Sequence, residues 1–520
     1  MESTATASPG TIDTGTKTVN RLGKYDSTLF WTTLALCCAV VGWGILAPEN
    51  FSASMNAAQK WVTVNFSWFF MLAVSAFIGF AVWLGLSKYG DIPLGEDNEI
   101  PEFSYGSWIA MLFSCGIGVG FIFWGVAEPL YHYISPPYLA KGATPDAAPV
   151  AMQISLLHWG IHGWVPYTIC GLAIGYTTYR LKMPLSIANS LHGLIGDKTN
   201  GVWGKVVDFL AASATIAGIS TSLGMGLMSI KYGINHVFGA DLGQNGLIVV
   251  TLVIIVGYTI SAVSGIKRGI KWLSNINMIM AFFVLLFFLF AGPTRFLLNM
   301  LVDSVGQYFS NFFFMSFWTD PVAKASEGKW LGWWTVFYWC WWIAWAPFVG
   351  GFVARISRGR TIREFIFGVL LIPLVITFLW FNIVGGGALF AEMHQTVELY
   401  KAISDDLGSG IFVLLTTYPL GSLVAAVVFF NLIIFLITSC DSAAFFVGMI
   451  VSGGELEPST PIKLIFGFLI GSITLVLFFT GGWKALQIAS IVAALPFAFV
   501  MVGMIGSIYL MVKRDKKYAK

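Results

Sequence analysis

Apolar residues gather along this chain in long continuous runs, and short segments between them carry most of the charged side chains. Twelve runs are long enough for a helix to cross a hydrocarbon core of about 30 Å. Each predicts a membrane helix, because a helix satisfies its backbone polar groups without water. The predicted spans are 28–48, 66–87, 107–127, 153–179, 206–230, 247–265, 275–292, 333–356, 365–390, 421–452, 464–480 and 485–512.

Composition and charge extend this picture. Hydrophobic residues make up 57% of the chain, charged residues 11%, and the mean hydropathy is +0.78, which excludes a soluble globular protein. An even number of spans places both termini on one side. With the termini in the cytoplasm, 21 of the 29 lysines and arginines fall in inner segments. We therefore expect an all-α, multi-pass protein of the inner (plasma) membrane, surrounded by lipids and without a nucleic-acid partner.

Two of the predicted spans contain helix-breaking residues at corresponding positions. Span 107–127 contains Gly116, Gly118 and Gly120, and span 333–356 contains Pro347 followed by a Gly-Gly pair. Breaks that recur five helices apart indicate two inverted repeats, with substrate held where the backbone is unwound. Close packing of helices through small residues is the alternative explanation.

This pattern predicts the domain organisation. It consists of a cytoplasmic tail (1–27), a transmembrane domain (28–512) and a short cytoplasmic tail (513–520). Within the domain, 107–292 and 333–512 are the repeats (helices 3–7 and 8–12), with two peripheral N-terminal helices. Residues 293–332 between the repeats include the stretch 295–317, whose spacing predicts an amphipathic helix on the outer surface. That helix is either packed on its own chain or a contact between protomers.

Aromatic side chains cluster near the middle of two spans. In span 333–356, Trp341 and Trp345 lie on one face at i, i+4, and Trp342 lies beside them. Span 153–179 supplies the natural partners, Trp159, Trp164 and Tyr167. Ring faces attract organic cations that cannot donate hydrogen bonds, so this set predicts a cage for such a cation.

A few polar residues inside or next to the spans are candidates for metal binding or other chemistry. His158 and His162, at i, i+4, have a spacing that suits a metal, but no acid or cysteine nearby completes a site. We therefore expect packed, hydrogen-bonded imidazoles. Glu128 lies at the outer end of its span, shallow enough to be solvated.

Span 421–452 carries a polar group at its centre. The hydroxyls of Thr438 and Ser439, with carbonyls freed at a helix break, would suit sodium. The alternative is that the hydroxyls bond the carbonyls of their own helix. Asp441 would either brace a helix break or bind the ion directly.

Four stretches resemble the betaine/choline/carnitine transporter family, across essentially all twelve helices. They are GIGVGFIFWGVAEP (116–129), HWGIHGWVPY (158–167), FYWCWWIAWAPFVGGFVARISRGRTIREF (337–365) and ITSCDS (437–442). The resemblance implies secondary transport of an onium zwitterion, no enzymatic activity, and a homotrimer held by the outer amphipathic helix. It implies that the carboxylate meets helix-3 amides at Gly116 and Gly118. It also implies substrate-box or access-path positions at Trp159, Trp164, Tyr167, Trp341, Trp342 and Trp345, and sodium at Ser114, Ile117, Thr438 and Ser439.

Departures from the family pattern narrow the prediction. Gly120 stands where proton-coupled choline carriers have an acid, and Val349 where sodium-independent carnitine exchangers have a methionine. A second sodium site would need two threonines, which align with Thr215 and Ile219. We therefore predict sodium symport of a substrate such as glycine betaine, with one ion and no other cofactor.

Several rival functions stay open. Within the class they are a carnitine-type exchanger and a carrier of choline or dimethylsulfoniopropionate. From another class, a channel would need a continuous polar path, and a membrane enzyme would need clustered acids, Ser–His pairs or metal ligands in the spans.

Overall fold

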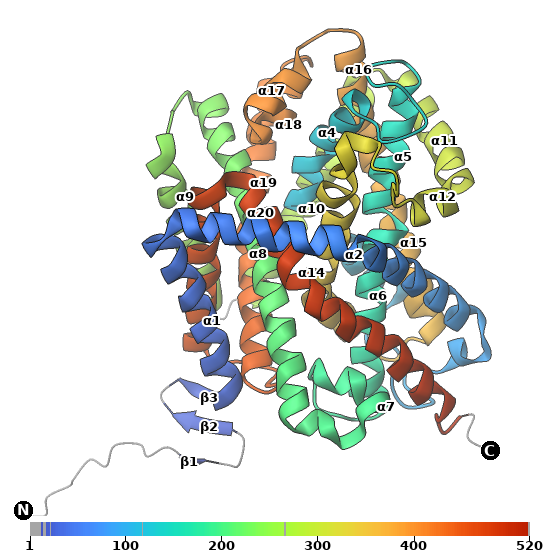
Figure 1. Cartoon of the computed structure of the whole chain (residues 1–520), viewed down its shortest axis with the longest axis vertical. Coiled ribbons are helices and arrows are strands. Elements are labelled where there is room, and N and C mark those ends of the chain that lie inside the picture. The colour runs from blue at the N-terminus through green and yellow to red at the C-terminus, as the bar shows by residue number, and fades with distance from the viewer. Residues whose placement is uncertain (1–11, 14–16, 21, 117, 265–266, 518–520) are drawn as a thin grey trace, which may run out of the picture.

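Helices dominate the computed structural model, which describes residues 12–13, 17–20, 22–116, 118–264 and 267–517 (Figure 1). A small antiparallel sheet precedes them, in the order β1 (Ile12–Asp13), β2 (Lys17–Asn20) and β3 (Gly23–Asp26). The last residue of β3, Asp26, accepts a hydrogen bond from the Leu29 amide and so caps α1.

The first half of the chain forms the helices expected from its apolar runs, several of them divided. Short helical elements lie between them. They are the 3₁₀ helices η1 (Lys88–Asp91), η3 (Ala188–Leu191) and η4 (Gly196–Asn200) and the π-helix η2 (Tyr176–Arg180). The α-helices are α1 (Ser27–Leu46), α2 (Pro48–Leu86), α3 (Tyr105–Gly116), α4 (Val119–Ile134), α5 (Ala147–Trp159), α6 (Ile161–Gly175), α7 (His192–Ile195), α8 (Val202–Phe238), α9 (Gly243–Ser264) and α10 (Lys267–Ala291).

The second half of the chain likewise forms helices along its apolar runs, with short elements between them. Its short elements are the 3₁₀ turns η5 (Ala325–Gly328) and η7 (Leu407–Ser409) and the π-helical η6 (Phe381–Gly385). Its α-helices are α11 (Thr294–Ser310), α12 (Phe312–Phe317), α13 (Trp330–Trp333), α14 (Thr335–Ile356), α15 (Ile362–Trp380), α16 (Gly386–Met393), α17 (Leu399–Asp405), α18 (Gly410–Leu415), α19 (Gly421–Val451) and α20 (Thr460–Lys513).

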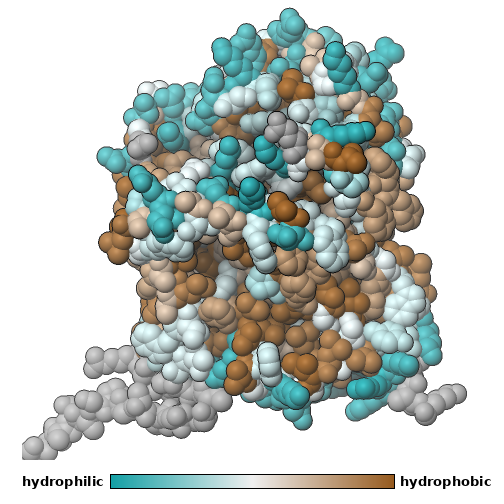
Figure 2. Space-filling model, in the orientation of Figure 1, coloured by the Kyte–Doolittle hydropathy of each residue, from teal (hydrophilic) through white to brown (hydrophobic). Residues whose placement is uncertain are grey.

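Length and composition identify membrane spans among these helices. In the described part of the chain, seven helices are long and apolar enough to cross a membrane. A further pair, Asn275–Ala291 and Thr294–Ser310, passes the same test but is bent by 111°. Figure 2 shows apolar residues over much of the lower half of one face, with hydrophilic residues gathered at the upper end and along the lower rim. A helical, multi-pass membrane protein is confirmed, while the count of twelve and the inverted repeats stay predictions.

The two predicted helix breaks have different outcomes. The first is present, because α3 ends at Gly116 and α4 begins at Val119, with Gly118 extended between them. The second prediction is wrong, since α14 continues through Pro347 to Ile356. Gly350 serves close packing instead: a Cβ there would lie 2.8 Å from the backbone nitrogen of Gly171 on α6.

Other breaks were not expected from the sequence. The predicted span 153–179 is divided at Gly160, so that α5 ends at Trp159 and α6 begins at Ile161. A Cβ at Gly160 would lie 2.5 Å from the Leu156 carbonyl oxygen, so this tight turn needs glycine. In α20, Gly481 and Gly482 have non-helical backbone angles, which places a kink between the two predicted spans merged there.

The described ends of the chain lie at the same end of the molecule. The sheet β1–β3 and the last turns of α20 are both at the lower end in Figure 1. Ion pairs tie nearby connections together there, including Lys205 with Asp26 at 3.0 Å and Arg180 with Asp515 at 2.7 Å. The shared end agrees with an even number of crossings. Its assignment to the cytoplasm stays a prediction.

Candidate functional site

A cavity with about 750 Å³ of empty space, its opening to solvent included, lies beside the break between α3 and α4. It is walled by α4, α6, α8, α14 and α19, with Trp159 closing it from the end of α5. All six predicted aromatic residues and Gly118 line it. The lining residues are Gly118, Val119, Gly120, Phe121, Trp159, Gly163, Trp164, Tyr167, Ile219, Ser222, Leu223, Trp341, Trp342, Trp345, Val349, Leu436, Ser439 and Cys440.

Three indoles form one corner of this cavity. The rings of Trp341 and Trp342 stack with centroids 4.8 Å apart and an interplanar angle of 15°. Trp159 meets Trp342 edge-on at 4.9 Å and Trp341 at 5.9 Å. Tyr167 extends the group, with its ring 6.2 Å from Trp342 and 5.4 Å from Trp164. The helix break at Gly160 separates Trp159 from Trp164 and lets one stretch of sequence supply two walls.

Backbone hydrogen bonds hold two of these indoles in place. Trp342 Nε1 donates to the His158 carbonyl oxygen at 2.8 Å, and Trp341 Nε1 donates to that of Gly218 at 3.4 Å. Because those N–H groups are engaged, the two rings offer their apolar faces. Trp345 differs, since its buried Nε1 has no partner among the described residues.

The rings of Trp159 and Trp341 leave no room for a side chain at position 120. A Cβ on Gly120 would lie 2.7 Å from the ring of Trp159 and 3.2 Å from that of Trp341. A carboxylate side chain here, as in proton-coupled choline carriers, would collide with both indoles. A Cβ on Gly118, by contrast, would meet no atom of the described residues within 4 Å.

The predicted sodium residues on α19 are only partly placed at the cavity. Ser439 lines it, whereas Thr438 does not. The Thr438 hydroxyl donates to the carbonyl oxygens of Ile434 and Phe435, at 2.9 and 3.1 Å. α19 itself runs unbroken from Gly421 to Val451, and the break expected to free carbonyls for the ion, between α3 and α4, is present. The Thr438 oxygen nevertheless keeps lone pairs that can bind a cation.

The remaining predicted ligands belong to the break after α3. Ile117 and the side chain of Ser114 lie outside what the structure describes. Gly116 ends α3, and its surroundings also lie outside what the structure describes. Where a second sodium would need a hydroxyl, Ile219 presents a hydrocarbon side chain to the cavity, and the Thr215 hydroxyl bonds its own helix.

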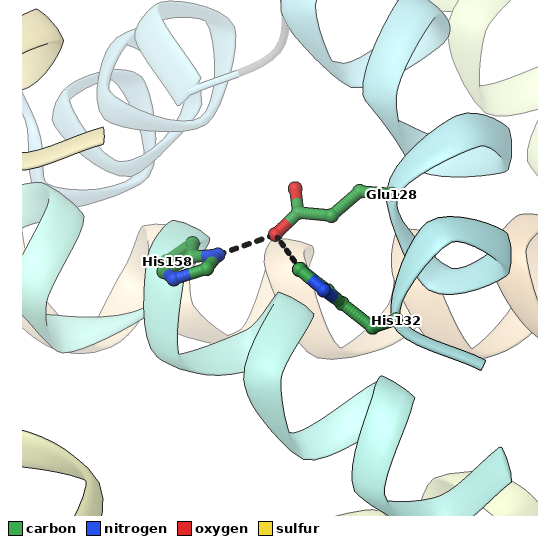
Figure 3. A group of neighbouring side chains, drawn as sticks. All are labelled: Glu128, His132 and His158. Atoms are coloured by element: carbon green, nitrogen blue, oxygen red, sulfur yellow. Dashed lines mark hydrogen bonds and ion pairs between the residues drawn. The ribbon is translucent and has the colours of Figure 1, made fainter. Parts of the chain in front are cut away.

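A buried carboxylate lies behind the aromatic corner, contrary to expectation. Glu128 is fully buried rather than solvated. Its Oε1 lies 2.5 Å from His158 Nδ1 and 3.3 Å from His132 Nε2, as Figure 3 shows. Its Oε2 accepts from Trp159 Nε1 at 2.6 Å and lies 2.5 Å from the Tyr338 hydroxyl. Glu128 thus connects two histidines directly to an indole of the cavity.

The surroundings of the two predicted histidines are therefore partly different from expectation. Both imidazoles are packed and hydrogen-bonded, His158 Nε2 to Thr335 at 2.9 Å and His162 Nε2 to Ser316 at 2.8 Å. The premise that no acid lies near them is wrong, since Glu128 bonds His158. One ligand atom each from Glu128, His132 and His158 lies within 4.8 Å of the others, a donor set that zinc accepts. Both His158 nitrogens already have partners, which favours a hydrogen-bonded network.

Asp441 has a structural partner on another helix. Its Oδ2 accepts a hydrogen bond from Ser261 on α9 at 3.0 Å. It therefore braces α19 against α9 and does not brace a helix break.

Sequence reasoning missed several residues of the site. Phe121, Ser222 and Leu436 line the cavity but lie in apolar or small-residue runs that give no sign of their role. Glu128 could have been found, because an acid next to a span with a histidine at i+4 is a functional candidate by default.

Comparisons with known proteins identify relatives of this chain. Residues 28–517 match the model of the BCCT, betaine/carnitine/choline family transporter. The glycine betaine transporter OpuD of Bacillus subtilis (strain 168) is 40% identical over 497 residues, covering 96% of each chain. A probable glycine betaine transporter of Desulfitobacterium hafniense (strain Y51) is 39% identical, covering 95% of this chain and 98% of its own. An ectoine/hydroxyectoine transporter of Virgibacillus pantothenticus is 37% identical, with the same two coverages.

Proposed function

This chain belongs to the betaine/carnitine/choline transporter family, and on that premise we propose that it takes up glycine betaine or a related zwitterion together with sodium. As a family member it is a multi-pass secondary transporter and not an enzyme. The observation that carries the choice of substrate is the corner of Trp159, Trp341 and Trp342, whose ring faces suit an alkylated cation. The names of its relatives, which include glycine betaine and ectoine carriers, support a zwitterion.

The other end of a zwitterion is a carboxylate, and the start of α4 suits it. Gly118 and Val119 line the cavity at the N-terminus of α4, where backbone N–H groups and the helix dipole favour an anion. The Trp345 N–H, which has no partner among the described residues, is a further donor that lines the cavity from α14. The substrate would therefore lie with its onium head at the indoles and its carboxylate at the start of α4.

Sodium coupling is proposed for the hydroxyl pair on α19. Ser439 lines the cavity with Gly118, and Thr438 precedes it on the helix. These oxygens are neutral, so they would not compete with the indoles for the onium head. The hydrocarbon of Ile219 where a second site would need oxygen supports one sodium per cycle.

Uptake into proteoliposomes tests this function. We expect glycine betaine uptake that requires external sodium, with a Hill coefficient of about 1. The double variant Thr438→Ala, Ser439→Ala should lose sodium-driven uptake, whereas Ser442→Ala, exposed on the same helix, should keep it. Full transport in sodium-free potassium buffer, or exchange that needs only internal substrate, would reject symport and favour a carnitine-type exchanger.

Orientation and assembly are also proposed. Counting lysines and arginines favours the end with the sheet β1–β3 as the cytoplasmic side of the inner membrane. The outer helices α11 and α12 would hold a homotrimer. Their exposed apolar residues support a contact, as discussed below.

A further inference from the structure

We propose that Glu128, His132 and His158 form a proton-binding site that holds Trp159 in the cavity and makes onium affinity depend on pH. This inference rests on the proposed function, because it concerns how that cavity binds its substrate. The three side chains point toward one another from α4 and α5 (Figure 3). They are separate from Gly120, where proton-coupled family members carry their acid.

The hydrogen bonds define which groups of the network donate and which accept. An indole N–H can only donate, so Oε2 of Glu128 must accept from Trp159. His158 has partners on both nitrogens, Oε1 of Glu128 and the Thr335 hydroxyl, and therefore satisfies both atoms as a neutral ring. His132 bonds Glu128 through Nε2, while its buried Nδ1 has no partner among the described residues.

Charge balance then gives the number of protons. With both imidazoles neutral and Glu128 ionised, the network carries one negative charge, and all three side chains are fully buried. None of their described partners is a lysine or arginine. An unpaired buried charge is unfavourable, so the network takes up one proton as the pH falls.

Other elements that face the network contribute no second charge. The α14 residue Tyr338 donates or accepts at Oε2, and its ring stacks on His158 at 4.6 Å. The rings of Trp330 and Trp334 pack on His132 at 5.3 and 4.5 Å. On α16, the acid Glu392 accepts from the Tyr400 amide instead. Among the described residues, the titratable groups bonded to Glu128 are thus the two histidines and Tyr338.

The network and the cavity share Trp159. One edge of its indole bonds Glu128, and the ring itself meets the indoles of Trp341 and Trp342. An ionised Glu128 behind Trp159 attracts a cation in the cavity. As the hydrogen-bond acceptor of the Trp159 N–H, it also holds the indole ring in place. An onium head therefore binds more tightly to the deprotonated network, and its binding releases a proton. Glu128 is a positioning residue in this scheme and does not touch the substrate.

Binding measured against pH tests the inference. Glycine betaine does not titrate near neutrality, so its affinity can be measured between about pH 5 and about pH 8 in saturating sodium. For the wild type we expect about a tenfold weaker affinity at about pH 5 than at about pH 8. This is the effect expected from losing one negative charge that is separated from the onium head by the width of an indole ring. Glu128→Gln should have the weak affinity throughout. His162→Gln, a buried histidine bonded to Ser316 outside the network, should keep the wild-type dependence.

A second measurement keeps the inference falsifiable if Glu128→Gln does not fold. Adding glycine betaine to wild-type protein in weakly buffered solution near neutrality should release protons. Equal affinity at both pH values, no proton release, or a wild-type pH dependence in Glu128→Gln would overturn the inference while leaving the proposed substrate intact. No binding of glycine betaine at any pH would reject the proposed substrate and this inference together.

Discussion

Trp342 offers a ring face to the cavity because its N–H is already bonded to the His158 carbonyl oxygen. Replacing it with leucine removes one desolvated cation–π contact, worth about 2 kcal/mol or roughly thirtyfold in affinity. We expect the same loss for Trp341→Leu and Trp164→Leu, measured by tryptophan-fluorescence titration with glycine betaine.

A matched control lies on the same helix. Trp339 is buried in α14 but stacks on His162 and does not line the cavity. Trp339→Leu should leave the affinity of the folded protein unchanged. If it weakens binding as much as the cavity variants do, the aromatic corner is not the onium site.

Gly120 allows a test of space at single-atom scale. A methyl group at Gly120 would press on the rings of Trp159 and Trp341, whereas one at Gly79, on α2 outside the cavity, meets open space. Gly120→Ala should therefore weaken glycine betaine binding at least about tenfold, because a core overpacked by one methyl shifts its side chains. Gly79→Ala should bind within about threefold of wild type in the same titration. Similar affinities for the two variants would contradict this account of position 120.

At the scale of elements, α11 and α12 divide their apolar residues between two faces. Leu297 and Met300 are buried against the chain itself, and Phe312 packs on His162. Other large apolar residues point outward, with Val302 and Phe313 each about three-quarters exposed. The remaining exposed ones are Leu298, Phe309, Phe314 and Phe317. Several exposed large apolar residues on helices outside the predicted spans favour a contact with another protomer.

Phe313→Glu tests that contact. A charge in the centre of an apolar interface is costly, so the protein in mild detergent should shift from trimer to monomer. Asn299→Glu adds the same charge to an exposed polar position of α11 and should leave the mass unchanged. Light scattering on the purified variants distinguishes the two, and a wild-type monomer in crosslinked native membranes would exclude the trimer.

At the scale of the whole molecule, the basic segment after α14 is neutralised by an acidic segment far away in sequence. Arg355 pairs with Glu102 at 2.5 Å and Arg358 with Glu99 at 2.5 Å. The hydrogen bond from Arg355 holds the pKa of Glu102 below its ordinary value. These pairs join the connection before α3 to the end of the helix that carries Trp341.

Arg180 makes the most buried of these inner ties. Its guanidinium donates to both oxygens of Asp515, and the Tyr176 hydroxyl donates to the same carboxylate at 2.6 Å. Arg180→Gln leaves that buried carboxylate unpaired and should cost about 3 kcal/mol. Arg358→Gln, at a side chain 45% exposed, should cost about 0.5 kcal/mol. Thermal unfolding in detergent should show a drop in Tm of several degrees for the first variant only.

The pH dependence of this tie has a definite sign. Burial opposes ionisation of Asp515, but the bonds from Arg180 and Tyr176 outweigh it and hold its pKa below the ordinary value. A lowered pKa in the folded state gives stability that is present above the unfolded pKa and lost as the pH falls through the folded one. The tie should thus persist at the acidic end of the binding experiment. A large loss of Tm already at about pH 5 would contradict this.

The sequence by itself was sufficient for the helical membrane architecture and for the aromatic set. A long continuous apolar run crosses a bilayer as a helix, so the membrane helices can be read directly from the sequence. The sequence also predicted which aromatic residues line the cavity, because large aromatic side chains near the middle of a span have few other roles. These residues are Trp159, Trp164, Tyr167, Trp341 and Trp342. Helix spacing placed Trp341 and Trp345 on one face of α14, whereas the break at Gly160 puts Trp159 and Trp164 on different helices.

Tertiary structure decided what depends on a neighbour from a distant segment. Gly350 could break α14 or let α6 approach it, and only the position of Gly171 distinguishes these two roles. Thr438 could free its hydroxyl or bond its own helix, and the unbroken α19 permits the second. Glu128 was expected in solvent because depth along one helix was the only guide. Its burial follows from His158 and Tyr338 on two other helices, because a carboxylate leaves water only where donors from other segments replace it.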